Sequence, residues 1–194
     1  DIRRAAEVGR KFKLPCAYDR TDMLFRANLD MVSICTSPWS HADYAIQALS
    51  HGCHVLTEKP MAMSVQEAEE MIACAKTNQR MLTVSHNFQF ARSMRLALNL
   101  LHNGAIGRVQ HIMALQLSSP KRRLPTWCAR LPGGLYYDES PHMLYLLRCF
   151  AGDLSLQSVH VERAEAGSQQ PIRRLEAYFR GEQADAHVKM FFEA

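Results

Sequence analysis

The 194-residue sequence predicts two α/β units, a parallel-sheet unit followed by a unit with a mostly antiparallel open sheet. Up to residue 87, short apolar runs alternate with segments of helical periodicity, the arrangement that gives parallel strands joined by helices. Beyond residue 154, three strand-like segments are joined by polar turns, as in an antiparallel sheet. The boundary is predicted near residues 87–92, which gives units of residues 1–88 and 89–194.

The first unit is predicted to alternate helices and strands. Apolar residues at helical spacing predict the helices, and a capping box of Ser64 and Glu67 marks the start of the last one, because each residue can bond the other's backbone N–H. The expected helices are residues 2–12, 21–28, 41–50 and 64–77, and the expected strands are residues 31–35, 54–56 and 81–85.

The second unit is predicted to contain fewer helices and longer strands. Residues 118–134 are rich in Pro, Gly and basic side chains, which predicts a connecting segment between its elements. The expected helices are residues 92–102 and about 139–150, and the expected strands are residues 109–117, 156–161, 174–179 and 186–192.

Composition excludes several classes of protein. With 47% hydrophobic and 22% charged residues, the chain can bury roughly 70% of its extended surface. The net charge of +4 is spread out apart from Lys121, Arg122 and Arg123, which argues against a nucleic-acid partner. No apolar run reaches the roughly 20 residues that cross a bilayer, so no membrane partner is expected. The six cysteines lack CxxC spacing, which predicts reduced thiols and a cytoplasmic protein.

Polar residues follow two of the predicted parallel strands. Thr36, Pro38 and His41 come after the first strand, and Glu58 and Lys59 come after the second, immediately before Pro60. Ligands bind beyond the carboxyl ends of such strands, where a lysine can act as general acid or base and a carboxylate can anchor a sugar hydroxyl. The competing interpretations are a tight turn with a helix cap and a solvated charged loop.

A third segment, residues 133–142, begins with two glycines and contains Asp138 and His142. Their i, i+4 spacing places both side chains on one face of a helix, in a first turn where Pro141 is tolerated. A carboxylate beside an imidazole can set its tautomer for proton transfer. The alternative is that Asp138 caps the helix and His142 is a satisfied core histidine.

Together these segments resemble the Gfo/Idh/MocA family of NAD(P)-dependent oxidoreductases. The resemblance depends on an ordered set of motifs, namely residues 30–41, 52–60, 103–109, 133–142 and Gly152-Asp153. It implies a Rossmann-like dinucleotide-binding domain, then an α/β domain that presents substrate and often mediates homo-oligomers. NAD or NADP would be the cofactor, and a sugar, polyol or related small molecule the substrate.

The resemblance also implies roles for individual residues. Lys59 would lie beside the nicotinamide, and Asp138 and His142 would match the Asp-xxx-His pair of the family, with Lys59 or His142 moving the proton. The implied cofactor-binding residues are Thr36, Pro38, His41, Glu58, Lys59 and Asn87, and the implied substrate-binding residues are Trp127, Arg130 and His142.

The sequence departs from the family at its start, where neither the first strand nor the Gly-rich phosphate-binding turn is found. It is therefore expected to be an internal fragment that is inactive alone. His51, Cys53 and His54 have no second cluster at ligand spacing, so no metal is expected. Two other functions stay open: a non-catalytic dinucleotide-binding regulatory protein and an NAD-dependent glycosidase of the same family.

Overall fold

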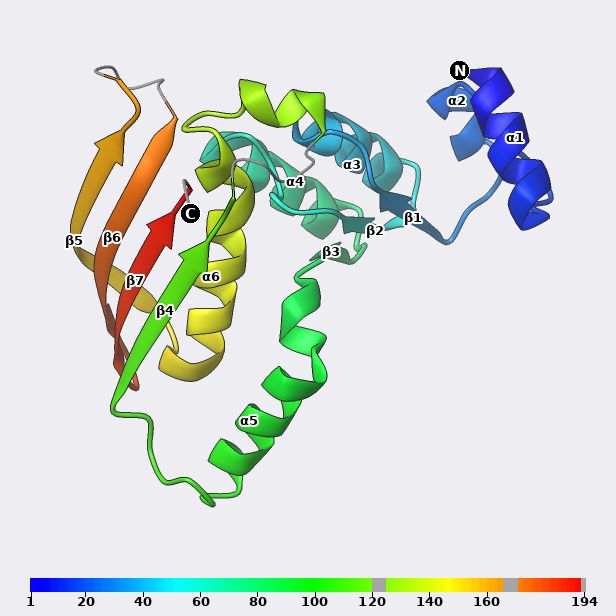
Figure 1. The fold of residues 1–194 in the computed structure, drawn as a ribbon. Helices are drawn as coiled ribbons and strands as arrows, with labels where there is room; N and C mark the ends of the chain where they lie inside the picture. Colours follow the sequence, from blue (N-terminus) through cyan, green and yellow to red (C-terminus); the bar gives the residue numbers. More distant parts are fainter. Residues whose placement is uncertain (120–124, 166–170, 193–194) are drawn as a thin grey trace. The chain divides into compact units, whose positions relative to one another are not determined.

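The computed structural model describes residues 1–119, 125–165 and 171–192. Its contacts divide the chain into two compact units, Asp1–Val84 and Ser85–Ala194 (Figure 1). This division falls four residues before the boundary of 88/89 that the sequence predicts.

The first unit is built on a three-stranded parallel sheet in the order β1-β2-β3, formed by Met31–Ile34, His54–Thr57 and Leu82–Val84. Helices α3 (His41–Ser50) and α4 (Val65–Thr77) pack against each other and against these strands (Figure 1). The core between them contains fully buried alanine, leucine and methionine side chains, among them Ala45, Ala48, Leu49 and Met71.

The predicted capping box at the start of α4 is present with one change. Glu67 donates its backbone N–H to the Ser64 hydroxyl at 3.1 Å, as expected. Its carboxylate, however, accepts from the N–H of Met63 at 2.8 Å, one residue before the predicted Ser64. The side chain therefore also holds the segment that leads from Pro60 into the helix.

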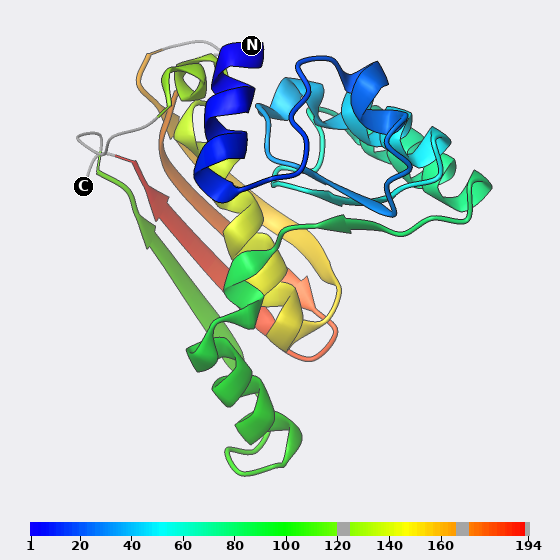
Figure 2. The same ribbon diagram turned by 90° about the vertical axis from the view of Figure 1, so that its right-hand side faces the viewer.

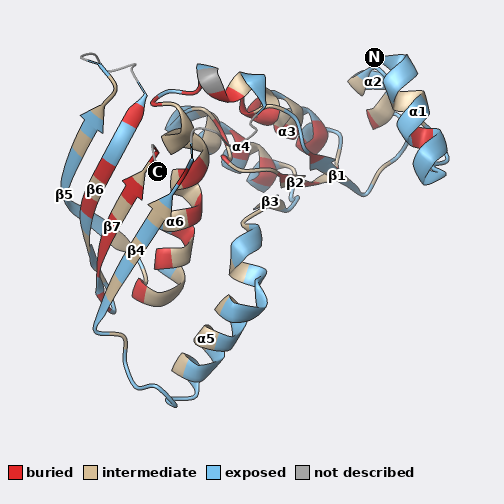
Figure 3. Ribbon diagram, viewed as in Figure 1, coloured by how far each residue is buried: buried red, intermediate tan, exposed pale blue. Residues whose placement is uncertain are grey.

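Two helices precede this sheet. Helix α1 (Ile2–Phe12) begins at Asp1, whose carboxylate accepts from the N–H groups of Arg3 and Arg4. Helix α2 (Thr21–Phe25) is three residues shorter than the predicted segment, and Asn28 beyond its end adopts a left-handed conformation with φ 52°. Within α1 only Gly9 is buried, so this helix adds little to the core (Figure 3).

The second unit is built on a four-stranded sheet in the order β4-β7-β6-β5. These strands are His111–Leu117, Asp185–Phe191, Ile172–Gly181 and Leu154–Arg163, respectively. β4 pairs with β7 in parallel, and the other two pairings are antiparallel. The predicted fold class, a parallel-sheet unit followed by a mostly antiparallel open sheet, is confirmed.

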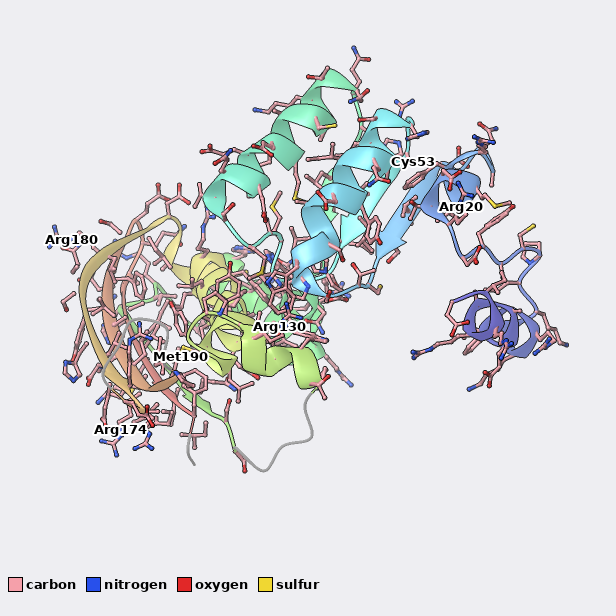
Figure 4. All side chains as sticks on the ribbon, turned by 90° about the horizontal axis from the view of Figure 1, so that it is seen from above. Arg20, Cys53, Arg130, Arg174, Arg180 and Met190 are labelled. Atoms are coloured by element: carbon pink, nitrogen blue, oxygen red, sulfur yellow. The ribbon has the colours of Figure 1, made fainter. Side chains whose placement is uncertain are left out.

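Helix α6 (Leu135–Ala151) lies along one face of this sheet (Figures 1 and 2). Leu147 from the helix packs with inward-facing strand residues such as Val188 and Met190. Figure 4 shows Met190 between the sheet and the helix, whereas Arg174 and Arg180 project from the other face. Alternation along the strands thus gives one buried face and one exposed face.

Helix α6 starts four residues earlier than predicted. Gly133 and Gly134 have φ values of 70° and 69°, a left-handed backbone that glycine adopts without steric cost, and the helix begins directly after them. Pro141 therefore lies inside the helix, where the sequence placed it in the first turn. Asp138 remains in the first turn, as expected.

The connection from β3 to β4 contains two helical segments. A short 3₁₀ helix, η2 (Asn87–Phe90), leads into α5 (Arg92–His102), and neither has a buried residue (Figure 3). η2 contacts α6, whereas α5 has exposed leucines such as Leu96 and Leu100. Two more short 3₁₀ helices, η1 (Pro38–Ser40) and η3 (Thr126–Arg130), lie in segments that the sequence predicts as connections.

Candidate active site

In the first unit, the carboxyl ends of the parallel strands are in register. Ile34 at the end of β1 pairs with Thr57 at the end of β2, and Thr57 pairs with Val84 of β3. Thr36 and Lys59 each lie two residues beyond the last residue of their strand. The Glu58 N–H also donates to the Ile34 carbonyl at 2.9 Å. The candidate residues of this unit therefore lie at one edge of its sheet, as the sequence predicts for parallel strands.

His41 joins the two loops at this edge. It is fully buried, with Nδ1 2.8 Å from the Pro60 carbonyl oxygen and Nε2 3.1 Å from the Thr36 carbonyl oxygen. The neutral imidazole donates to one of these oxygens, and the imidazolium cation donates to both. Both nitrogens thus face backbone atoms, which makes His41 a residue that holds the loops rather than one that faces a ligand.

The other candidates at this edge are more accessible. The Thr36 side chain is exposed, and its oxygen accepts from the Ser40 hydroxyl at 2.8 Å, which leaves the Thr36 proton able to donate. Pro38 is buried at the start of η1. Glu58 and Lys59 are half-buried, and the Glu58 carboxylate accepts from the Lys59 N–H at 3.3 Å. The Lys59–Pro60 peptide bond is cis.

In the second unit, the candidate residues surround the first half of α6. Asp138 and His142 lie on the same face of the helix, one turn apart, and Tyr145 follows on that face. His142 Nδ1 is 2.7 Å from the hydroxyl oxygen of Tyr145. The Phe88 ring stacks on the His142 ring, with centroids 4.4 Å apart. A hydrogen bond to the Tyr145 hydroxyl and stacking against the Phe88 ring are therefore among the contacts that hold His142.

Tyr145 also binds the segment before α5. Its hydroxyl oxygen accepts from the Phe88 N–H at 3.2 Å, and its ring stacks on His86 at 4.3 Å. Burial raises the pKa of Tyr145 above its usual value, although the Phe88 N–H acts in the opposite direction. Burial lowers the pKa of His86, which favours its neutral form. The surroundings of His142 are thus aromatic and hydrogen-bonded.

Sequence reasoning missed His86, Phe88 and Tyr145. Tyr145 lies three residues after His142, and that helical spacing is a signal that could have identified it. No comparable pattern pointed to His86 or Phe88, because Phe88 is 57 residues before Tyr145 and the two meet only through the fold.

The remaining predicted substrate and cofactor residues of this unit lie near α6. Asn87 is exposed beside Phe88 in η2. Trp127 is half-buried and Arg130 is exposed on η3, which contacts α6 (Figure 4). Glu139 is buried beside this region and accepts from the Gln116 side chain at 3.0 Å. The basic cluster of residues 121–123 lies outside the described residues.

Within the described ranges 1–119, 125–165 and 171–192, no three or more His, Cys, Asp or Glu side chains are arranged to hold a metal ion. In the same ranges, no helix has the length and apolar character needed to cross a membrane.

Comparisons with known proteins agree with the fold. The profile of a family described as "Oxidoreductase family, NAD-binding Rossmann fold", GFO_IDH_MocA, matches residues 1–86. Residues 1–86 thus match the Gfo/Idh/MocA family. The resemblance predicted from the ordered motifs is thus confirmed, and so is the Rossmann-like character of the first unit.

Two relatives of the chain are described as dehydrogenases. It is 32% identical to D-glucoside 3-dehydrogenase of Escherichia coli over 147 residues, 73% of this chain and 41% of that protein. It is 26% identical to myo-inositol 2-dehydrogenase of Thermotoga maritima over 156 residues, 79% of this chain and 46% of that protein. The chain thus spans less than half the length of these two relatives.

A solved structure of levoglucosan dehydrogenase, in complex with NADH and levoglucosan, has the same fold. It superposes with a TM-score of 0.87 at 21% identity and covers 100% of this chain and 56% of that chain. At this identity the match supports the fold of the chain.

Proposed function

We propose that the protein is an NAD- or NADP-dependent oxidoreductase that acts on a carbinol or carbonyl carbon of a sugar, polyol or related small molecule. The observation that carries this proposal is Lys59, held beside Glu58 at the carboxyl edge of a parallel sheet in a family whose profile describes NAD binding. The relatives named for glucosides and inositol support a polyhydroxylated substrate.

The residues at this edge fit a dinucleotide. The exposed Thr36 hydroxyl can donate to the cofactor, and the Glu58 carboxylate can accept from ribose hydroxyl groups. Asn87 is proposed to bind the cofactor as well. Pro38 and His41 are proposed to act by shaping the loop, because both are buried. When bound, the nicotinamide supplies hydride transfer, and the protein supplies orientation and proton handling.

Three side chains are proposed to serve the chemical step. Lys59 or His142 would move the proton of the substrate. Asp138, one turn before His142 on α6, would orient substrate or imidazole. Trp127 and Arg130 on η3 are proposed to contact the remainder of the substrate.

The test is the replacement of Lys59 in the natural protein at full length. We expect Lys59→Ala to lower kcat/KM for NAD(P)-dependent turnover by about 100- to 10,000-fold, the usual effect of losing a general acid or base. Lys76→Ala, in the last turn of α4 in the same unit, is the matched control and should retain activity. Equal turnover of the Lys59 and Lys76 variants would refute the role of Lys59.

The exposed face of the second sheet supports a homo-oligomer. Met113, Leu115 and Leu117 of β4 alternate onto this face and are 69%, 56% and 59% exposed. A row of large apolar side chains is typical of a surface that another protein covers. Light scattering of the full-length protein measures its oligomeric state, and a strict monomer at all concentrations would refute this part of the proposal.

A further inference from the structure

Ser40 does not use its hydroxyl group in the way that its position in the helix predicts. It is the N-cap residue of α3, where a serine oxygen ordinarily accepts from a backbone N–H of the first helical turn. In the described part of the chain, the Ser40 side chain makes no such bond. Its hydroxyl points back along the chain and donates to the side-chain oxygen of Thr36 at 2.8 Å. A contact with Thr36 therefore replaces the helix cap.

The Ser40 proton has two acceptors within reach, and the geometry favours Thr36. The Ser40 hydroxyl oxygen is 2.8 Å from the Thr36 side-chain oxygen and 3.0 Å from the Ser37 carbonyl oxygen. That carbonyl oxygen already accepts from the backbone N–H of Ser40 at 3.0 Å. The Thr36 oxygen is thus an acceptor on the side that faces Ser40, and the proton of Thr36 is available for another partner.

Thr36 is held at two points by the start of α3. Nε2 of His41 lies 3.1 Å from the Thr36 carbonyl oxygen, and Ser40, the preceding residue, binds the Thr36 hydroxyl. The first contact fixes the backbone of Thr36, and the second fixes the orientation of its hydroxyl group. The Thr36 side chain is nevertheless exposed, at the carboxyl edge of the parallel sheet. Its proton is therefore directed away from Ser40, on the side where ligands bind to such sheets.

We propose that Ser40 is a positioning residue for the dinucleotide, because its bond to the Thr36 oxygen makes the Thr36 hydroxyl a hydrogen-bond donor to an acceptor oxygen of the cofactor. This inference rests on the proposed oxidoreductase function, which assigns Thr36 to cofactor binding. It adds Ser40, which has no part in that function so far, and it specifies that Thr36 donates rather than accepts.

The reverse arrangement of the two protons leads to the opposite expectation. If Thr36 donated to Ser40, the Thr36 proton would be used within the protein, and removal of the Ser40 hydroxyl would release it for the cofactor. Ser40→Ala would then leave the affinity for the dinucleotide unchanged or increase it. If Ser40 is the donor, the same substitution lets the Thr36 hydroxyl rotate freely, and ordering it again on binding lowers the affinity. The direction of the change therefore identifies the donor.

Fluorescence titration of the natural full-length protein with NADH and with NADPH tests the proposal. For the dinucleotide that binds more tightly, we expect Thr36→Val to raise the Kd about five- to tenfold and Ser40→Ala about three- to fivefold, the range for one neutral hydrogen bond and its orientation. Ser40→Thr keeps the hydroxyl and should retain the wild-type Kd. Ser50→Ala, at the last residue of the same helix, is the matched control and should retain it as well.

The double variant separates positioning from a general structural effect. Thr36→Val removes the oxygen that Ser40 binds, so the addition of Ser40→Ala should raise the Kd no further. A further rise would mean that Ser40 affects binding by another route, and it would overturn the proposal. A Kd of Ser40→Ala equal to or below the wild-type value would overturn it as well.

Thermal unfolding without ligand tests the bond between Ser40 and Thr36 by itself. The decreases in Tm caused by Ser40→Ala and Thr36→Val should not add up in the double variant, because each substitution breaks the same bond. Additive decreases in a protein that binds the dinucleotide would overturn the role of Ser40 alone. A wild-type protein that binds neither NADH nor NADPH would instead overturn the proposed function, and with it the cofactor role of Ser40.

Discussion

His41 and His142 follow a similar pattern in the sequence, yet the structure holds them differently. Both are buried, both lie in the first half of a helix, and a proline precedes each within three residues. His41 directs both ring nitrogens at backbone carbonyl oxygens. His142 has Nδ1 against the hydroxyl of another side chain and a phenylalanine ring on its face.

The comparison shows that burial alone does not separate a structural histidine from one that serves chemistry. The partners do. His41 contacts backbone carbonyl oxygens of two loops, those of Thr36 and Pro60, and therefore holds the two loops together. A side-chain hydroxyl can instead set which nitrogen of the ring carries the proton. We therefore expect the loss of His41 to lower stability and the loss of His142 to lower activity.

The largest expected effect is that of His142→Ala on turnover. Its kcat/KM should fall by about 100- to 10,000-fold, because a group that acts on the substrate oxygen is removed. The free energy of unfolding should fall by about 2 kcal/mol, because the Tyr145 hydroxyl loses its bond to Nδ1 and keeps the bond from the Phe88 N–H. Steady-state kinetics and urea unfolding measure the two effects, and full activity in this variant would remove the distinction between the two histidines.

The next effect is that of His41→Ala on stability. The substitution leaves a cavity at a fully buried site and removes the ring that contacts two carbonyl oxygens. The free energy of unfolding should therefore fall by about 3 kcal/mol. His51→Ala, at the other end of α3, is the control. His51 is exposed and bonds a carbonyl oxygen of its own helix, so its replacement should lower the free energy of unfolding by less than about 1 kcal/mol. Equal losses in the two variants would show that His41 does not hold the loops.

Local patterns in the sequence were sufficient to predict most of the fold. In the part of the chain that the structure describes, apolar periodicity predicted the strands and α-helices, and the ends of β1 and β2 identified Thr36, Glu58 and Lys59 as neighbours along one edge. The i, i+4 spacing of Asp138 and His142 is also a local property, and the structure places both on one face of α6.

What the sequence could not predict depends on contacts between distant segments. The bonds of His41 reach Pro60, 19 residues away, and those of Tyr145 reach Phe88, 57 residues away. The early start of α6 depends on two consecutive glycines that both adopt positive φ. A pattern of polar residues identifies which side chains gather at a strand end, but the partner of each nitrogen is set by the packing of the loops.

A third histidine extends the comparison to a carboxylate partner and gives the smallest expected effect. His187 Nε2 lies 2.7 Å from Oε1 of Glu176, which Lys189 and Tyr178 also contact at 3.1 and 3.2 Å. The Lys189 ammonium, and then the His187 ring, hold the pKa of Glu176 below its ordinary value of 4.5. A lowered pKa in the folded state stabilises the fold above that ordinary value, and this stabilisation is lost as the pH falls through the lowered pKa.

Thermal unfolding of the wild type and of Glu176→Gln should therefore differ at neutral pH and converge as the pH falls from about 5 to about 3. Because the Glu176 side chain is 37% exposed, the difference should be small and should shrink in high salt. A difference that stays constant over this pH range would mean that the carboxylate charge does not contribute, and that His187 is held by its stacking on Tyr178, with ring centroids 4.0 Å apart. His187 would then resemble His142, whose ring is also stacked, more than the histidine of a charged pair.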